Sequence, residues 1–255
     1  MIFTDFFTFS NCDKLMQVKV NQAEKRSWLE VDLGQITTNL KTFQQALPRE
    51  TNIMAVIKAD AYGHGDIKVA QILTDYGVNM FAVSNIDEAV GLRKAGIRGL
   101  ILILGYTSPI YAEELYSYDL TQTIVSEEYA KALSEKDYRV KCQFAIDTGM
   151  NRIGLSSKDP RHIRDIICRY CGVFDVNGIF THLCVADSDE KEDICFTWSQ
   201  LEKFNNVVEA VSSLNLPYIH CFNTAGGFRY LNNSKYSRIA VSYTHLRAHE
   251  TLRHL

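Results

Sequence analysis

The stretch that decides the fold is residues 52–104, NIMAVIKADAYGHGDIKVAQILTDYGVNMFAVSNIDEAVGLRKAGIRGLILIL. Three short apolar runs alternate in it with two segments whose apolar residues have helical spacing. Gly77 and Gly96 follow the two helical segments, and Ser84 with Asp87 has the spacing of a capping box before the second one. The apolar runs are NIMAVI (52–57), MFAVS (80–84) and LILIL (100–104). This order predicts parallel strands joined by helices.

The same alternation continues on both sides of this stretch. Upstream, residues 33–47 have helical spacing, with Asp32 as the expected N-cap and Pro48 after the last turn. Downstream, five more apolar runs are TQTIV (121–125), CQFAI (142–146), VNGIF (176–180), YIHCF (218–222) and SRIAV (237–241), with helices expected near 127–137, 161–170 and 196–213.

Eight continuously apolar strands in a chain of this size favour an α/β fold of the (β/α)₈, TIM-like barrel type, because continuous apolar runs indicate burial on both faces. A doubly wound sheet is the alternative fold. The sequence has neither a GxGxxG after a strand nor a Walker-type loop, which disfavours that alternative.

Composition and charge narrow the possible partners. Of the 255 residues, 46% are hydrophobic and 22% are charged, which excludes a disordered or fibrous chain. A formal net charge of −3 provides no basic face for nucleic acid or anionic lipid, so we expect a small-molecule partner. No apolar run reaches the roughly 20 residues that span a bilayer. Residues 1–10 lack the basic region and cleavage site of a secretory signal, so we expect a cytoplasmic protein.

The seven cysteines do not predict a disulfide framework, because their number is odd and the chain is large. Cys168 and Cys171 form a CxxC, but they lie in a segment with an apolar helix face. That face consists of Ile163, Ile166, Ile167 and Tyr170. We therefore expect a buried or half-buried pair of thiols on a helix, and no metal site, since no second ligand cluster accompanies the CxxC.

Chemistry-bearing residues follow the ends of four candidate strands, where a barrel places its active site. Lys58 directly follows the first run. Its side chain either reaches into solvent or is an amine of lowered pKa that forms a Schiff base. Arg152 lies in a loop whose glycines permit it to face either a carboxylate or solvent. His182 follows the sixth strand, where a satisfied core histidine is the ordinary alternative. NTAGG (223–227) follows the seventh and offers a hydroxyl and backbone N–H groups to a phosphate.

Together these segments resemble the alanine racemase family of fold-type III pyridoxal phosphate enzymes, from about Arg26 to Ala240. The motifs that carry the resemblance are RSWLEVDLGQI (26–36), AVIKADAYGHG (55–65), DTGMNRIG (147–154), GIFTHLCVAD (178–187) and HCFNTAGG (220–227). ILILGYTSP (101–109) and FTHLCVADS (180–188) look closest to the racemase domain of the serine/alanine racemases of glycopeptide-resistance systems. The resemblance implies a pyridoxal 5'-phosphate cofactor, interconversion of L- and D-alanine or of the serine enantiomers for peptidoglycan, and a homodimer.

The resemblance also implies a role for each site residue. Lys58 would bind the cofactor covalently and act as the base on one face of the substrate Cα, and Arg152 would bind near the cofactor phenolic oxygen and the substrate carboxylate. The other cofactor-binding residues would be Tyr62 and Thr224 at the phosphate, His182 beside the pyridine ring, Asn223 in support, and Arg238 at the pyridine nitrogen. The base on the opposite face would be a tyrosine from the C-terminal β-domain of the partner subunit.

The chain departs from the family pattern at three places. Ala145 stands where many family members carry a modified lysine that orients the arginine, so that support for Arg152 is expected to be missing. Residues 1–25 have no family counterpart, and residues 241–255 read as a foreign tail. We therefore expect a truncated barrel over 26–240, with an incomplete last strand and no β-domain. In the tail, His249, Glu250 and His254 miss the HExxH zinc spacing by one residue.

Two other functions remain as alternatives at this stage. One is a non-catalytic, single-domain barrel that carries pyridoxal phosphate. DTGM and AYGHG resemble the racemase more than such a carrier. The other is an unrelated barrel enzyme in which the lysine and the arginine coincide by chance.

Overall fold

The computed structural model describes residues 27–49, 51–231, 239–242 and 250–254. Eight parallel strands form one sheet in the order β10-β2-β3-β4-β5-β6-β8-β9. They are β2 (Asn52–Val56), β3 (Met80–Val83), β4 (Leu100–Ile103), β5 (Thr121–Ile124), β6 (Lys141–Asp147), β8 (Asp175–Phe180), β9 (Tyr218–His220) and β10 (Ile239–Ser242). The short strand β7 (Leu155–Ser156) pairs with β6 beside this path.

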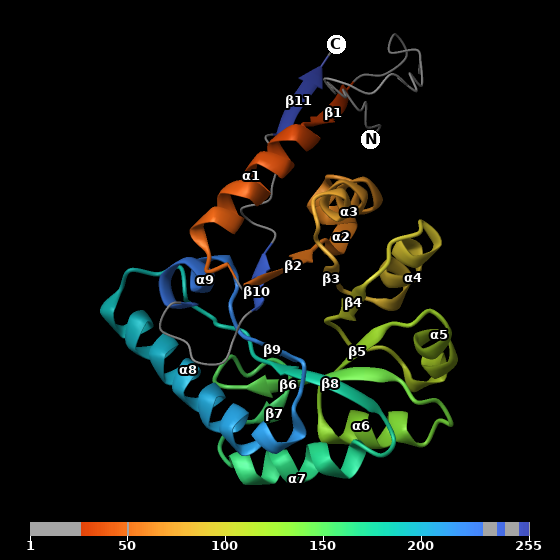
Figure 1. Cartoon of the computed structure of the whole chain (residues 1–255), viewed down its shortest axis with the longest axis vertical. Helices are drawn as coiled ribbons and strands as arrows, with labels where there is room; N and C mark the ends of the chain where they lie inside the picture. The colour runs from red at the N-terminus through yellow and green to blue at the C-terminus, as the bar shows by residue number, and fades with distance from the viewer. Residues whose placement is uncertain (1–26, 50, 232–238, 243–249, 255) are drawn as a thin grey trace.

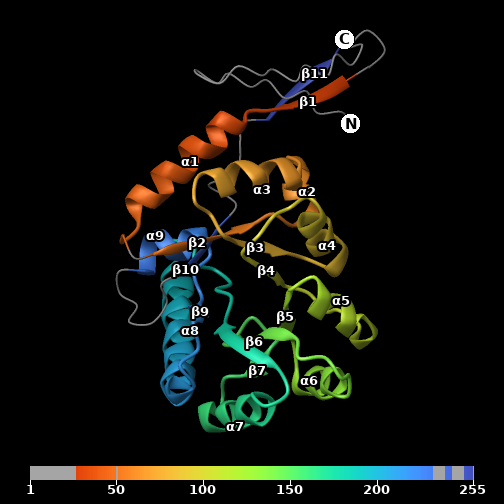
Figure 2. The same ribbon diagram turned by 45° about the vertical axis from the view of Figure 1, so that its right-hand side comes forward.

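This strand order confirms the predicted TIM-like barrel. Of these eight strands, β10 comes last along the chain and pairs with β2, which comes first, so that Ile239 lies opposite Asn52 and the sheet returns to its start. β9 approaches β10, although no ladder joins these two strands within the described part of the chain. Figures 1 and 2 show the helices arranged around the outside of the strands. All eight predicted apolar runs contribute a strand.

The helices cover the outer face of the sheet. They are α1 (Leu33–Ala46), α2 (Lys58–Gly63), α3 (Asp66–Asp75), α4 (Ile86–Lys94), α5 (Ala112–Ser117), α6 (Glu127–Ser134), α7 (Pro160–Tyr170), α8 (Lys191–Ala210) and α9 (Thr224–Tyr230), with 3₁₀ turns η2 (Pro109–Tyr111) and η3 (Ser212–Leu214). Consecutive strand residues such as Phe81 and Ala82 are both fully buried. Because consecutive side chains point to opposite faces, the strands are buried on both sides, as their continuous apolar runs predicted.

The helix ends follow the predicted signals, with one correction. Asp32 caps α1 by accepting a hydrogen bond from the Gln35 N–H at 3.1 Å. Gly77, at φ +90°, and Gly96, at φ +88°, end α3 and α4 in the left-handed conformation typical of a C′ glycine. The predicted cap at Ser84 is wrong by one residue, because Asn85 is the N-cap of α4.

Two predicted helices differ from the expected boundaries, and two short helices were not predicted. α6 ends at Ser134 instead of 137, and α8 begins at Lys191 instead of 196. The first turn of α8 carries Lys191, Glu192 and Asp193, so it has no apolar periodicity that could reveal it. The short helices η2 and α5 between β4 and β5 were not predicted, since six residues are too few to show a clear period.

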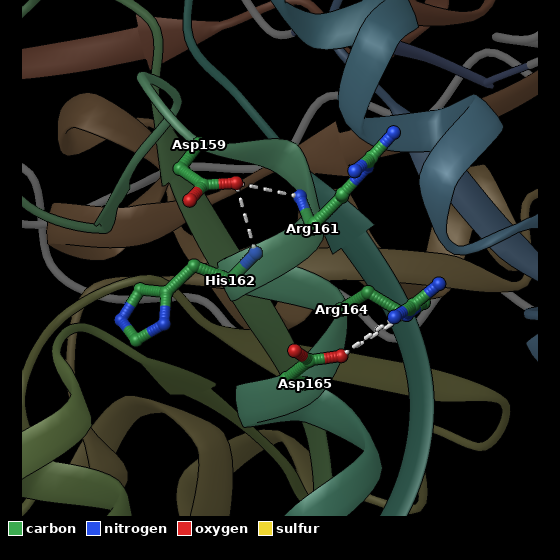
Figure 3. Close-up of polar contacts among 5 residues, drawn as sticks. All are labelled: Asp159, Arg161, His162, Arg164 and Asp165. Atoms are coloured by element: carbon green, nitrogen blue, oxygen red, sulfur yellow. Dashed lines mark hydrogen bonds and ion pairs between the residues drawn. The ribbon is translucent and has the colours of Figure 1, made fainter.

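Helix α7 begins at an aspartate cap, which Figure 3 shows in close-up. One carboxylate oxygen of Asp159 accepts hydrogen bonds from the N–H groups of Arg161 at 3.0 Å and His162 at 3.1 Å. Pro160 occupies the first helical position, where its missing N–H costs nothing. Farther along the exposed face, Arg164 and Asp165 form an ion pair at 2.9 Å.

The buried face of α7 is the one that the sequence predicted, since Ile163, Ile166, Ile167 and Tyr170 are all buried. The expectation for its two cysteines is only partly right. Cys171 is half-buried, but Cys168 is exposed, because it lies on the opposite side of the helix from the isoleucines.

A second, two-stranded sheet lies outside the barrel, beyond α1 in both views (Figures 1 and 2). It pairs β1 (Ser27–Val31) antiparallel with β11 (Glu250–His254). His249 lies outside the described residues. Among the helices that the structure describes, none is both long and apolar enough to cross a membrane.

Candidate active site

The candidate site lies at the carboxyl ends of the parallel strands. Lys58 follows β2, Arg152 lies in the loop after β6, His182 follows β8, and Asn223 follows β9. Because these strands are parallel members of one sheet, their carboxyl ends open at the same end of the barrel. Arg238 lies outside the described residues, so its predicted place in the site stays a prediction.

Lys58 is half-buried, and the backbone before it continues the sheet. The Ile57 N–H donates to the Ala82 carbonyl of β3 at 2.9 Å. Within the described part of the chain, the Lys58 ammonium forms no hydrogen bond or ion pair. This amine is therefore free to react with a small molecule.

The four residues after Lys58 form a left-handed turn, which the sequence did not reveal. Ala59, Asp60, Ala61 and Tyr62 have φ angles of 52°, 55°, 50° and 57°. Each such residue other than glycine costs about 1–2 kcal/mol relative to the right-handed conformation. Strain of this kind persists only where the surrounding structure holds it, and it concentrates at functional sites.

Arg152 is presented by a loop with its own internal support. One carboxylate oxygen of Asp147 accepts from the Gly149 N–H at 2.9 Å and from the Asn151 N–H at 3.0 Å. Gly154, at φ +111°, donates its N–H to the Val125 carbonyl at 2.8 Å. The Arg152 guanidinium is exposed and forms no hydrogen bond or ion pair with the described residues, so it is available to an anionic ligand.

His182 lies where the positive charges of Lys58 and Arg152 both act on it. Its side chain is exposed at the end of the barrel, yet desolvation by the surrounding protein lowers its pKa, and the positive charges of Arg152 and Lys58 lower it further. The structure therefore brings these three predicted site residues into one electropositive neighbourhood. A histidine with a lowered pKa is neutral at pH 7, which suits a ring that packs against another ring.

A pocket lies between β6, β8 and the Arg152 loop. Its lining is Ala145, Ile146, Asp147, Met150, Arg152, Ile153, Phe180, Thr181 and His182. Ala145 is buried there, and a Cβ on Gly154 would come within 2.8 Å of the Ala145 backbone. The glycine is thus required for the close approach of the loop to β6 at Ala145.

Gln200 of α8 is a site residue that the sequence reading missed. Its side chain is fully buried and contacts two segments. Its Nε2 donates to the Thr148 hydroxyl at 3.1 Å and to the His182 carbonyl at 3.2 Å, while its Oε1 accepts from the Cys184 N–H at 3.1 Å. A glutamine within an apolar helical pattern was the available signal, because such a residue needs buried partners.

Asn223 and Thr224 begin α9, which the sequence predicted as a turn. Asn223 is the N-cap: its Oδ1 accepts from the Gly226 N–H at 2.9 Å, and its Nδ2 donates to the Leu183 carbonyl at 3.2 Å. Asn223 therefore ties the ends of β8 and β9 together. Thr224 is buried beside it. Tyr62, at the end of the left-handed turn, is 45% exposed, and partial burial raises the pKa of its hydroxyl.

The sequence profile of the family described as alanine racemase, N-terminal domain, matches residues 31–247. The chain belongs to the alanine racemase N-terminal domain family. The match begins five residues after and ends seven residues beyond the expected boundaries at 26 and 240.

Members and relatives of the alanine racemase family match most of this chain. An amino-acid racemase of Enterococcus faecalis is 40% identical over 203 residues, which are 79% of this chain and 28% of that protein. A serine/alanine racemase of Enterococcus gallinarum is 36% identical over 199 residues, which are 76% of this chain and 27% of that protein. The chain thus spans about a quarter of the length of these two relatives.

A solved structure agrees with the family assignment. The structure of an alanine racemase from Clostridium difficile 630 superposes with a TM-score of 0.79 at 28% identity. The superposition covers 87% of this chain and 58% of that one. The barrel that the sequence predicted is therefore the barrel of this family.

Proposed function

We propose that this barrel binds pyridoxal 5'-phosphate and serves an amino-acid racemase that interconverts the enantiomers of alanine or serine. The observation that carries the proposal is the free amine of Lys58, half-buried at the end of β2 and electrostatically coupled to His182 together with Arg152. The family assignment and the relatives named for amino-acid, alanine and serine racemisation support it.

The chemistry of the donor set fits this cofactor. Pyridoxal phosphate is an aldehyde with a dianionic phosphate and a flat ring, so it requires a free amine, a positive environment and a ring-shaped surface. Lys58 offers the amine, Arg152 the positive charge, and a neutral His182 the flat surface. The buried Thr224 hydroxyl at the start of α9 and the Tyr62 hydroxyl are the proposed phosphate contacts.

When bound, the cofactor would supply an electron sink for the charge left on the substrate Cα after proton removal. In our proposal, Lys58 holds the cofactor and moves the Cα proton on one face, while Arg152 binds the substrate carboxylate. Asp147 keeps the arginine loop in place, because it binds two of the loop's N–H groups. Gln200 and Asn223 fix the backbone that carries His182 and Leu183.

Racemisation also requires a proton donor on the opposite face of Cα. We propose that a further domain of a second subunit supplies this group, as the family resemblance implies, so that the complete enzyme is a homodimer. Without that group, we expect racemisation to be slower by a factor of at least roughly 10²–10⁴, the usual contribution of a positioned proton-transfer group.

Borohydride trapping tests the proposal directly. The purified chain is mixed with pyridoxal phosphate, reduced with borohydride, digested and analysed by mass spectrometry. We expect the reduced label on the peptide that contains Lys58, and no label there in Lys58→Ala. Lys203→Ala is the matched control, since Lys203 contacts the Thr148 carbonyl at 3.4 Å on the same side of the fold.

The same preparation separates the racemase from a non-catalytic carrier. Exchange of the α-proton of alanine or serine into deuterated water is followed by NMR with the chain alone and with an extended chain that carries the proposed further domain. Label on Lys58 together with exchange by the extended chain supports the racemase. Label without exchange by the extended chain supports the carrier, and absence of label on Lys58 excludes both.

A further inference from the structure

Glu88 of α4 connects two segments that are far apart in the sequence. Its Oε1 accepts from the N–H of Ala59, the residue that follows Lys58, at 2.8 Å. Its Oε2 accepts from the N–H of Ser84 at 2.7 Å and from the Ser84 hydroxyl at 2.8 Å. The half-buried carboxylate therefore uses both of its oxygens, with one on each segment.

The peptide groups before and after Lys58 are consequently both hydrogen-bonded to the neighbouring strand β3 and the helix α4 that follows it. Before Lys58, the Ile57 N–H donates to the Ala82 carbonyl of β3 at 2.9 Å. After Lys58, the Ala59 N–H donates to Glu88, whose other oxygen binds Ser84 at the end of β3. These bonds fix the direction in which the Lys58 side chain leaves the backbone, because they hold the peptide planes at both sides of its Cα.

The hydrogen bond from the Ala59 N–H to Glu88 lies at the start of the left-handed turn. Ala59 is the first residue of that turn, with φ 52°. A hydrogen bond to a carboxylate is stronger than one between neutral groups, so it can hold a strained backbone in place. We propose that Glu88 is a positioning residue for Lys58, which maintains the left-handed turn and the reach of the amine into the site. The inference rests on the proposed function of Lys58.

A purely structural role for Glu88 is the competing explanation. Glu88 is the third residue of α4, where a glutamate commonly completes a capping box, and its own N–H donates to the N-cap Asn85 at 3.0 Å. A structural role at the start of α4 accounts for the bonds to Ser84, the residue before the N-cap. It does not account for Oε1, which reaches across to the β2–α2 connection.

Three variants distinguish the two explanations. Glu88→Ala removes the bonds on both segments. Glu88→Gln keeps an acceptor for one N–H and tests rescue by a conservative change. Asn85→Ala is the matched control, because it removes the cap of α4 and leaves the Glu88 carboxylate in place.

For each variant we would measure three quantities on the whole chain: urea unfolding without cofactor, hydrogen exchange of the peptide spanning 55–65, and the rate of covalent labelling of Lys58 by pyridoxal phosphate. We expect Glu88→Ala to label at least tenfold more slowly at equal folded fraction and to exchange faster at 55–65. We expect Glu88→Gln to recover part of the rate. Asn85→Ala is expected to label within about twofold of the unmodified chain.

Equal labelling rates in Glu88→Ala and Asn85→Ala at equal folded fraction would overturn the positioning role. Should Glu88→Ala fail to fold, Glu88→Met replaces it, since methionine has a similar length and no oxygen acceptor, and unchanged labelling and exchange in that variant would overturn the role as well. Failure of the proposed function has a different result, since the unmodified chain would then carry no label on Lys58. In that case hydrogen exchange at 55–65 still tests whether Glu88 holds the turn.

Discussion

His220 is a titratable side chain enclosed in the barrel, and its surroundings favour the neutral ring. Its Nε2 lies 2.8 Å from the Gln143 Oε1, and the ring stacks on Phe180 with centroids 5.0 Å apart. Burial lowers the pKa of His220 to about 3. Below pH 6.5 the unfolded chain binds a proton at this residue that the folded chain does not, so acid favours unfolding.

From these values we expect His220 alone to remove about 3 kcal/mol of stability between pH 7 and pH 4. Urea unfolding at a series of pH values measures this loss. In His220→Gln, which keeps a donor for Gln143, the pH dependence over that range should be clearly shallower. A variant whose stability falls as steeply as that of the unmodified chain would show that other groups cause the loss.

A second prediction at the residue scale concerns the contribution of the buried Gln200 side chain to stability. Replacing it by leucine leaves the Cys184 N–H without its side-chain partner, whereas the Thr148 hydroxyl keeps its hydrogen bond with the Thr181 hydroxyl at 2.9 Å. An unsatisfied buried group costs about 1–3 kcal/mol, so we expect Gln200→Leu to lower the free energy of unfolding by about 1–3 kcal/mol. Chemical denaturation measures the change. Glu202→Leu, on the exposed side of the same helix, should change it by less than about 0.5 kcal/mol.

At the scale of elements, the pairing of β8 with β9 depends on Gly178. A Cβ at this position would lie 2.3 Å from the Tyr218 carbonyl oxygen of β9. Because the obstacle is backbone, the strands must separate to accept it, and we expect Gly178→Ala to cost at least about 2 kcal/mol in thermal or urea unfolding. In Gly172→Ala the added Cβ meets nothing within 4 Å. A similar loss in both variants would contradict the steric explanation.

The elements that could be predicted from sequence are those whose apolar pattern is continuous. The eight strands and the buried face of α7 follow from runs such as LILIL and from the isoleucine spacing in α7. The start of α8 could not be predicted, because its first turn is charged and pattern alone carries no signal there.

The candidate site likewise has some features that could be predicted from the sequence and others that could not. The types and strand-end places of Lys58, Arg152 and His182 could be read from the sequence, since they follow apolar runs. The left-handed turn and the contacts of Glu88 and Gln200 could not, because they depend on bonds between residues 29 and 52 positions apart. Such contacts form only in the folded chain, and they produce no periodic pattern in the sequence.

At the scale of the whole molecule, the β1–β11 sheet is separate from the barrel in both views. A two-stranded sheet is at best marginally stable by itself, so it adds little to the stability of the barrel. We therefore expect a chain that ends at Ser242 to keep its free energy of unfolding within about 1 kcal/mol of the unmodified value. Loss of cooperative unfolding in that variant would show that the small sheet supports the barrel.

The pairing of β10 with β2 also determines when the site can form during synthesis. β2 carries Lys58 at its end, yet its partner Ile239 emerges from the ribosome almost a whole domain later. Until then the lysine strand has β3 on one side and open backbone groups on the other. Contacts so distant in sequence form slowly, since a long loop must close first. A nascent chain should therefore acquire the ability to bind an aldehyde at Lys58 late, close to the moment when Ser242 leaves the ribosome.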